Sequence, residues 1–138
     1  MKIIIINGPN LNLLGQRNID VYGLVSFEDY LLELKDAFPN VDLDYFQSNI
    51  EGELIDKLQE ADGIWDYVIL NAGGYTHTSV SIADCIDAIR IPVMEVHISN
   101  IYAREGFRKK SLLTAFCMGS IIGLGLDGYR LAVENIIK

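Results

Sequence analysis

Both histidines of this 138-residue chain lie at the ends of apolar runs that have the composition of buried strands. In "IPVMEVHIS" (91–99), Glu95, His97 and Ser99 alternate with apolar residues, so on an extended strand their side chains share one face. A carboxylate beside an imidazole can hydrogen-bond it, fix its tautomer and favour its protonated form, which is what a general acid or base needs. The alternative is a core histidine that its neighbour satisfies.

The other histidine, His77, lies in "NAGGYTHTS" (71–79), directly after a second apolar run. Paired glycines let the backbone approach a ligand, and the polar residues after them stand at an expected helix start, where free N–H groups bind carboxylates and phosphates. An ordinary helix cap would explain Thr78 or Ser79, but it would not explain His77 or the double glycine.

A long polar loop, "NGPNLNLLGQRNIDVYG" (7–23), follows the first apolar run. Ordered loops of this length are commonly lids over a site. This one carries Arg17 and Tyr22, and a guanidinium near a phenol lowers the phenol's pKa, so that a tyrosinate can act as a base at neutral pH. The alternative is that both are solvated loop residues.

Basic residues gather in "REGFRKKS" (104–111), although the chain has a net charge of −8. This segment is either a solvated turn or a place where an arginine meets an anionic or polyhydroxy ligand. The acidic balance argues against a nucleic-acid partner. No apolar run approaches the ~20 residues that span a bilayer, and no signal peptide is recognisable, so we expect a cytoplasmic protein without a membrane partner.

Two further features are expected to be structural. Cys85 and Cys117 show no CxxC spacing, which favours free thiols over a disulfide or a metal site. The stretch "GLGLDG" (123–128) matches a dinucleotide-binding pattern, but only ten residues follow it. The second strand and the acidic ribose ligand of such a site are therefore missing, and a tight strand–helix turn is the better interpretation.

Apolar periodicity predicts strands and helices that alternate along the whole chain. The expected strands are 2–7, 41–49, 67–71, 91–99 and 118–123, and the expected helices are 27–38, 51–65, 78–90, 111–117 and 126–138, the first capped by Ser26. This alternation predicts a single α/β domain, residues 1–138, with a flavodoxin-like parallel sheet in the order 2-1-3-4-5 and helices on both faces. The polar segments described above all follow strands, so one cleft is expected at the carboxyl ends.

Five segments together resemble the type II 3-dehydroquinate dehydratases: "NGPNLNLLGQR…YG", "QSNIEGELIDKL", "NAGGYTHTSVSIADCI", "EVHISNIYAREGFRKKS" and "GSIIGLGLDGYRLA". The resemblance runs essentially end to end, in the same order and at the same spacing. It implies a flavodoxin-like fold, assembly as a dodecamer built from trimers, and conversion of 3-dehydroquinate to 3-dehydroshikimate in the shikimate route to aromatic amino acids. It also implies an anti elimination through an enolate, without metal or cofactor.

The resemblance further implies roles for individual residues. Tyr22 would be the base beside the substrate ketone, Arg17 would hold it as tyrosinate, and Asn12 would hold a water against the enolate oxygen. His97, oriented by Glu95, would protonate the departing hydroxyl. The binding residues would be Asn71, His77 and Arg108 at substrate hydroxyls, Ile98 and Ser99 at its carboxylate, and Asp84, which would reach into the site of a neighbouring subunit.

The chain departs from the family pattern at two positions. Ala72 stands where a proline is usual, and "RNIDVY" lacks the proline that usually precedes the lid tyrosine, which predicts a more mobile lid. No lysine is among the cleft candidates, which disfavours a Schiff-base route. The competing class is a non-catalytic flavodoxin-like module that binds a small anion, for which Tyr22 and His97 would be dispensable.

Overall fold

Five parallel strands form one sheet in the computed structural model, which describes residues 1–16, 20 and 24–138. The strands are β1 (Lys2–Asn7), β2 (Asp42–Gln47), β3 (Tyr67–Asn71), β4 (Val93–His97) and β5 (Gly119–Ile122). Their order is β2-β1-β3-β4-β5, and every neighbouring pair is parallel. The flavodoxin-like sheet predicted from the sequence is confirmed.

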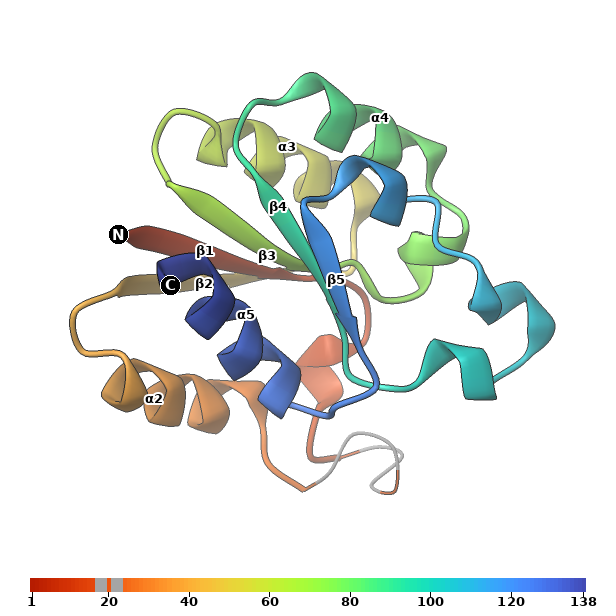
Figure 1. Cartoon of the computed structure of the whole chain (residues 1–138). Helices are drawn as coiled ribbons and strands as arrows, with labels where there is room; N and C mark the ends of the chain where they lie inside the picture. The colour runs from red at the N-terminus through yellow and green to blue at the C-terminus, as the bar shows by residue number, and fades with distance from the viewer. Residues whose placement is uncertain (17–19, 21–23) are drawn as a thin grey trace.

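Helices cover both faces of this sheet (Figure 1). On one face lie α2 (Phe27–Ala37) and α5 (Asp127–Ile137), and on the other lie α3 (Glu51–Ala61) and α4 (Val80–Ala88). The interior strand β1 contributes to both sides, because its alternate residues belong to different cores: Ile3 and Ile5 pack in one, and Ile4 and Ile6 in the other. This explains why β1 is an uninterrupted apolar run rather than an alternating one.

Two of the predicted helix caps are present. The Ser26 hydroxyl accepts a hydrogen bond from the backbone N–H of Asp29 at 3.2 Å, at the start of α2. For α4 the sequence did not distinguish between Thr78 and Ser79 as the capping residue. The structure selects Ser79, whose hydroxyl accepts from the N–H of Ile82 at 2.9 Å.

The helix expected over 51–65 is shorter than predicted, because α3 ends at Ala61. Gly63, with φ of 90°, has a left-handed backbone that an α-helix cannot contain. The carboxylate of Asp62, the residue that follows the helix, accepts hydrogen bonds from the N–H groups of Arg90 and Ile91. A tertiary contact to a distant segment therefore helps to end the helix.

The prediction of a helix over 111–117 is wrong, because that segment contains only the short 3-10 helix η5 (Thr114–Phe116). The Ser111 hydroxyl accepts hydrogen bonds from the N–H groups of Leu113 and Thr114, at 3.1 and 3.2 Å. These are the hydrogen bonds of an N-cap serine, as at Ser26 and Ser79, but the turn that follows ends at Phe116, because the backbone is extended at Cys117 and enters β5 at Gly119.

The strand expected over 91–99 is also shorter, since β4 ends at His97. Beyond it, Gly125 donates a backbone hydrogen bond to the carbonyl of Ile98 at 3.0 Å, where the chain leaves the sheet. Gly123 and Gly125 have φ of 87° and 62°, so the glycine-rich stretch makes the turn between β5 and α5. The prediction that Ser99 shares a strand face with Glu95 and His97 is therefore wrong.

A buried hydroxyl joins α5 to the carboxyl ends of two strands. Tyr129 is fully buried, and its hydroxyl donates to Asn7 Oδ1 at 2.8 Å while it accepts from Asn71 Nδ2 at 2.9 Å. Burial raises the pKa of this phenol strongly, so it remains a neutral donor. The last side chains of β1 and β3 are thus tied to one another through a helix.

Replacing Tyr129 with phenylalanine is expected to lower the free energy of unfolding by about 1–3 kcal/mol, because it leaves the buried amides of Asn7 and Asn71 with one partner fewer. Denaturant unfolding at one fixed protein concentration measures the change. Tyr67→Phe, which removes a hydroxyl from a half-buried side chain of β3, is the matched control and should shift the free energy by less than about 0.5 kcal/mol. Equal losses in both variants would contradict the assigned role of the Tyr129 hydroxyl.

None of the helices in the described part of the chain combines the length and the apolar character that crossing a bilayer requires.

Candidate active site

A cavity of about 130 Å³ opens where β3 and β4 end. It lies at the edge of the sheet where the sequence predicted a single cleft, and the segment that follows β1 forms one of its walls. The described residues that line it are Pro9, Asn10, Leu11, Asn71, Gly73, Gly74, His77, His97, Ile98, Ser99, Ile101, Arg104 and Arg108.

Most of the residues singled out from the sequence meet here. Those lining the cavity are Asn71, His77, His97, Ile98, Ser99 and Arg108, and Glu95 lies behind His97. Asn12 and Asp84 are exposed and are not among the lining residues; Asn12 Oδ1 accepts from Gln47 Nε2 at 3.5 Å, and Asp84 lies on α4. Arg17 and Tyr22, and with them the expectation of a mobile lid, lie outside the described residues.

The strand β4 delivers a buried imidazole–carboxylate pair to the cavity. His97 Nε2 and Glu95 Oε2 are 2.9 Å apart, and the two side chains are 5% and 0% exposed. This is the pair predicted from the two-residue spacing along an extended strand. Because Nε2 is engaged with the carboxylate, Nδ1 is the ring nitrogen left to exchange a proton with a molecule in the cavity.

Glu95 also accepts hydrogen bonds from two hydroxyls of the segment that follows the basic turn. Ser111 Oγ donates to Oε2 at 2.7 Å, and Thr114 Oγ1 donates to Oε1. Burial alone would raise the pKa of Glu95, but the hydrogen bonds that it accepts, the one from His97 first, lower it below its usual range. The carboxyl group is therefore ionised at neutral pH although it is fully buried.

The hydroxyls of Ser111 and Thr114 were not identified from the sequence. Their only signal is a pair of hydroxyl residues in "KKSLLT", directly after the basic turn. Nothing in that pattern says that the segment returns to β4.

His77 ends the 3-10 helix η2 (Gly73–His77), and its ring is fixed by the basic turn. Its Nδ1 lies 2.7 Å from the carbonyl oxygen of Lys110. A carbonyl only accepts, so Nδ1 carries the hydrogen, and the neutral ring keeps Nε2 as an acceptor for a hydroxyl in the cavity. The contact also ties η2 to the basic turn.

Asn71, the last residue of β3, is held on both sides of its amide. Its Oδ1 accepts from the N–H of Gly73 at 3.1 Å, and its Nδ2 donates to Tyr129. The strand end is closely packed, since Gly8 donates to the carbonyl of Asn71 at 2.7 Å and a Cβ on Gly8 would lie 2.5 Å from the oxygen of Ala72. Only glycine fits there, so position 8 is set by this close approach.

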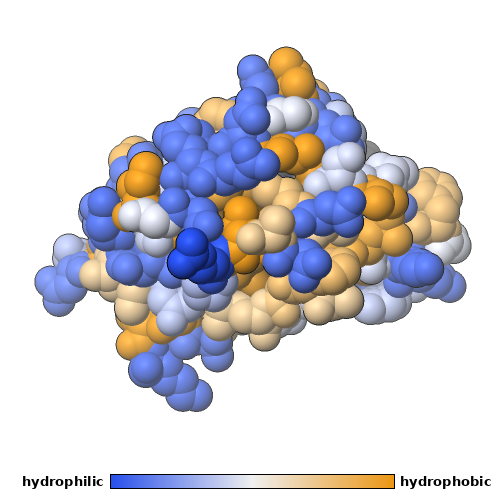
Figure 2. All heavy atoms as spheres, turned by 90° about the horizontal axis from the view of Figure 1, so that it is seen from above, coloured by the Kyte–Doolittle hydropathy of each residue, from blue (hydrophilic) through white to orange (hydrophobic). Residues whose placement is uncertain are grey.

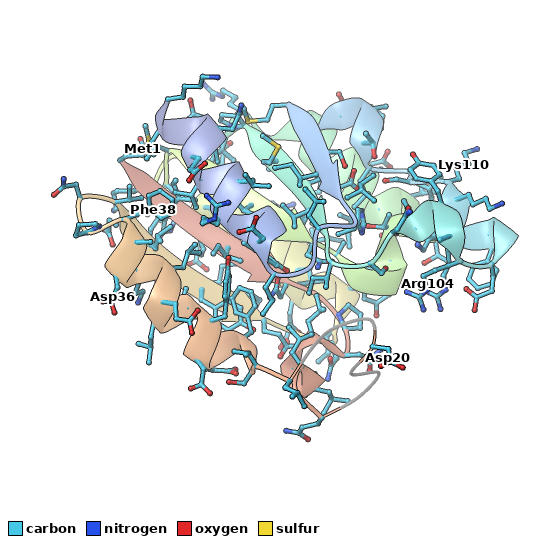
Figure 3. The ribbon with its side chains drawn as sticks, turned by 60° about the horizontal axis from the view of Figure 1, so that its bottom comes forward. Met1, Asp20, Asp36, Phe38, Arg104 and Lys110 are labelled. Carbon is cyan, nitrogen blue, oxygen red and sulfur yellow. The ribbon has the colours of Figure 1, made fainter. Side chains whose placement is uncertain are left out.

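Two guanidinium groups give the cavity a positive wall in a chain of net charge −8. Arg108, on η4 (Gly106–Lys109), donates from Nε to Glu105 Oε2 at 2.8 Å. Arg104, which follows η3 (Ile101–Ala103), donates from Nη1 to Ser99 Oγ at 3.4 Å. In Figure 3 Arg104 and Lys110 lie at the same end of the molecule, away from Met1. Of the two lining arginines, only Arg108 had been given a role from the sequence.

The cysteines are free thiols, as predicted. Burial, together with the negative charge of Glu95, raises the pKa of Cys117 to about 12, so that its sulfur is a thiol and not a thiolate nucleophile at neutral pH. Among residues 1–16, 20 and 24–138, no three His, Cys, Asp or Glu side chains gather as they would to hold a metal ion.

Comparison with known proteins gives one consistent family. The family model described as Dehydroquinase class II matches residues 1–137. The chain is 53% identical over 140 residues to a 3-dehydroquinate dehydratase of Campylobacter jejuni, covering 100% of this chain and 88% of the relative. It is 55% identical over 141 residues to one of Exiguobacterium sp., covering 100% and 95%. A solved type II dehydroquinase of Butyrivibrio crossotus superposes with a TM-score of 0.94 at 42% identity, covering 100% and 98%.

Proposed function

This chain belongs to the class II dehydroquinase family, and on that premise we propose that it is a hydro-lyase that converts 3-dehydroquinate to 3-dehydroshikimate. One observation carries the proposal: His97 lines a cavity with guanidinium groups in its wall, while its Nε2 is held by a buried, ionised carboxylate. That arrangement supplies an acid for a leaving hydroxyl beside charges that attract an anionic substrate.

The reaction proceeds by anti elimination through an enolate. A base removes a proton from the carbon next to the ketone, and the C–H electrons pass into the enolate. The enolate then re-forms the ketone as a carbon–carbon double bond is made, and the C1–oxygen bond breaks. His97 gives its proton to the departing hydroxyl, so that the oxygen leaves as water. Glu95 stabilises the protonated ring and fixes its orientation.

The base is Tyr22 in its ionised form, with Arg17 beside it to favour the tyrosinate and to stabilise the developing negative charge. Asn12 holds a water against the enolate oxygen. These three roles rest on the family's motif as it stands in "NLNLLGQRNIDVY". The chemistry uses neither a metal nor an organic cofactor, because the ketone already acidifies the neighbouring carbon.

Substrate binding follows from the cavity wall. Asn71, His77 and Arg108 meet substrate hydroxyls, and the fixed tautomer of His77 makes its Nε2 an acceptor for one of them. Ile98 and Ser99 follow the last residue of β4, and there they meet the carboxylate through backbone N–H groups and the serine hydroxyl.

We further propose that the site is completed in a dodecamer built from trimers, with Asp84 reaching the site of a neighbouring subunit. Asp84 is exposed on α4, one helical turn from Val80, which is 63% exposed. The surface above α3 and α4 carries apolar side chains among hydrophilic ones (Figure 2). The expected cytoplasmic location and the lack of nucleic-acid or membrane partners stay predictions.

The test is to add 3-dehydroquinate to purified protein and to follow ultraviolet absorbance, because the product is a conjugated enone carboxylate and the substrate is not. We expect absorbance to rise, and to rise equally after treatment with EDTA or borohydride. A folded protein that binds 3-dehydroquinate but produces no rise would contradict the enzyme and support the small-anion binding module. A rise abolished by borohydride would instead indicate a Schiff-base route.

A further inference from the structure

The carboxylate behind the proposed acid is held by more partners than the imidazole alone. Glu95 is 0% exposed, and both of its oxygens accept hydrogen bonds. Oε2 accepts from the ring of His97 and from the hydroxyl of Ser111, and Oε1 accepts from the hydroxyl of Thr114. Neither hydroxyl residue is among the described residues that line the cavity.

The direction of the Ser111 hydroxyl is settled by its other neighbours. Its oxygen accepts from the N–H groups of Leu113 and Thr114, at 3.1 and 3.2 Å. Two backbone donors occupy the lone pairs of this oxygen, so its single proton points to Glu95. Ser111 can therefore donate to the carboxylate but cannot accept from it. If Glu95 were protonated, its O–H group could not donate a hydrogen bond to Ser111.

These contacts affect the two possible positions of the proton in the Glu95–His97 hydrogen bond differently. In a dry interior, an imidazole and a carboxylate that face each other alone tend toward the neutral pair, with the proton on the carboxyl group. Hydroxyl donors stabilise the charged carboxylate, and their hydrogen bonds weaken if it becomes protonated. They therefore favour the pair in which the proton lies on the ring.

We propose that Ser111 and Thr114 are positioning residues that keep the proton of the Glu95–His97 hydrogen bond on Nε2 of His97, so that Nδ1 faces the cavity as part of a charged, acidic ring. The proposal rests on the proposed function for its effect on turnover, but not for the position of the proton. A neutral ring in the same place would donate from Nδ1 far less readily, because it would have to become an imidazolate.

Thr114→Val is the sharpest variant, because valine keeps the shape of threonine and removes only the hydroxyl donor. Thr114→Ser restores a hydroxyl and should restore function. Ser120→Ala is the matched control: Ser120 pairs with Glu95 in register on β5, and its buried hydroxyl makes no hydrogen bond with the described residues. Ser111→Ala is less suitable, since it also removes the acceptor of two backbone N–H groups.

In turnover we expect Thr114→Val to lower kcat by about 10-fold, with KM unchanged and Tm lowered by a few degrees, and Thr114→Ser and Ser120→Ala to match the wild type. In a Glu95→Gln background, Thr114→Val should have no further effect, because it acts only through the carboxylate. A wild-type kcat in Thr114→Val, or an equal loss in the Glu95→Gln background, would overturn the proposal.

The position of the proton is measured separately by nitrogen-15 magnetic resonance of ligand-free protein labelled at histidine. The chain has two histidines, and the spectrum of His77→Gln assigns the signals of His97. In the wild type we expect Nε2 of His97 to be protonated. In Thr114→Val we expect the proton to reside on Glu95 in a fraction of the molecules. The same Nε2 signal in both proteins would overturn the proposal. If the wild type does not dehydrate 3-dehydroquinate, the proposed function fails, while this measurement still decides the proton's position.

Discussion

Replacing His97 with glutamine is expected to lower kcat for the dehydration of 3-dehydroquinate by about 10²- to 10⁴-fold, the usual contribution of general acid catalysis. The leaving hydroxyl would have to depart without a proton, because glutamine can hydrogen-bond Glu95 but cannot transfer a proton to the substrate. Initial rates from product absorbance give kcat and KM, and calorimetric titration with the product measures whether binding is retained.

The matched control is His77→Gln, at the other histidine of the cavity. His77 is proposed to accept from a substrate hydroxyl, so its loss should raise KM and reduce kcat much less than the loss of His97. The assignment of His97 as the acid would be wrong if the two variants lost kcat equally, or if His97→Gln kept a wild-type kcat.

Replacing Tyr22 with phenylalanine is expected to lower kcat by about 10²- to 10⁴-fold as well, because the variant loses the base that takes the proton next to the ketone. Phenylalanine keeps the size of the side chain, so product binding should persist in calorimetric titration. Single-turnover rates of product formation, measured with enzyme in excess, show whether the lost step is chemical rather than product release.

This variant also separates the enzyme from the competing class, since a non-catalytic module would tolerate it without consequence. Tyr102→Phe, which removes a phenol from a side chain that is 59% exposed, controls for the loss of a hydroxyl as such and should leave kcat unchanged. An unchanged kcat in Tyr22→Phe would rule out the tyrosinate base and require another group to abstract the proton.

Much of the fold could be predicted because it depends on local patterns. The isoleucine run of β1 is apolar at consecutive positions since both faces of that strand are covered, and Ser26 begins α2 through a hydrogen bond within one turn. One error arose where a distant contact competes with local preference. Asp62 helps to end α3 by binding backbone groups 28 and 29 residues away.

The residues of the site likewise include some that local patterns predict and some that they do not. Glu95 and His97 were found from the sequence because a strand places residues two apart on one face, whatever the rest of the chain does. Their supports were not found, because Ser111 and Thr114 reach Glu95 across 16 and 19 residues, and the Tyr129 hydroxyl reaches Asn71 and Asn7 across 58 and 122. The proposed roles of Arg17 and Tyr22 depend on the family motif alone.

From the residues alone one could predict the alternation of strands and helices, which favours this sheet order, and the imidazole–carboxylate pair at a strand end. Each of these depends on the period of side chains along an element, which local residues set. Three features became visible in the fold: β4 ends at His97, the hydroxyls of Ser111 and Thr114 donate to Glu95, and Arg104 lines the cavity. Those features depend on where the packing of helices against the sheet brings loops together, and the local periodicity of the sequence does not predict this.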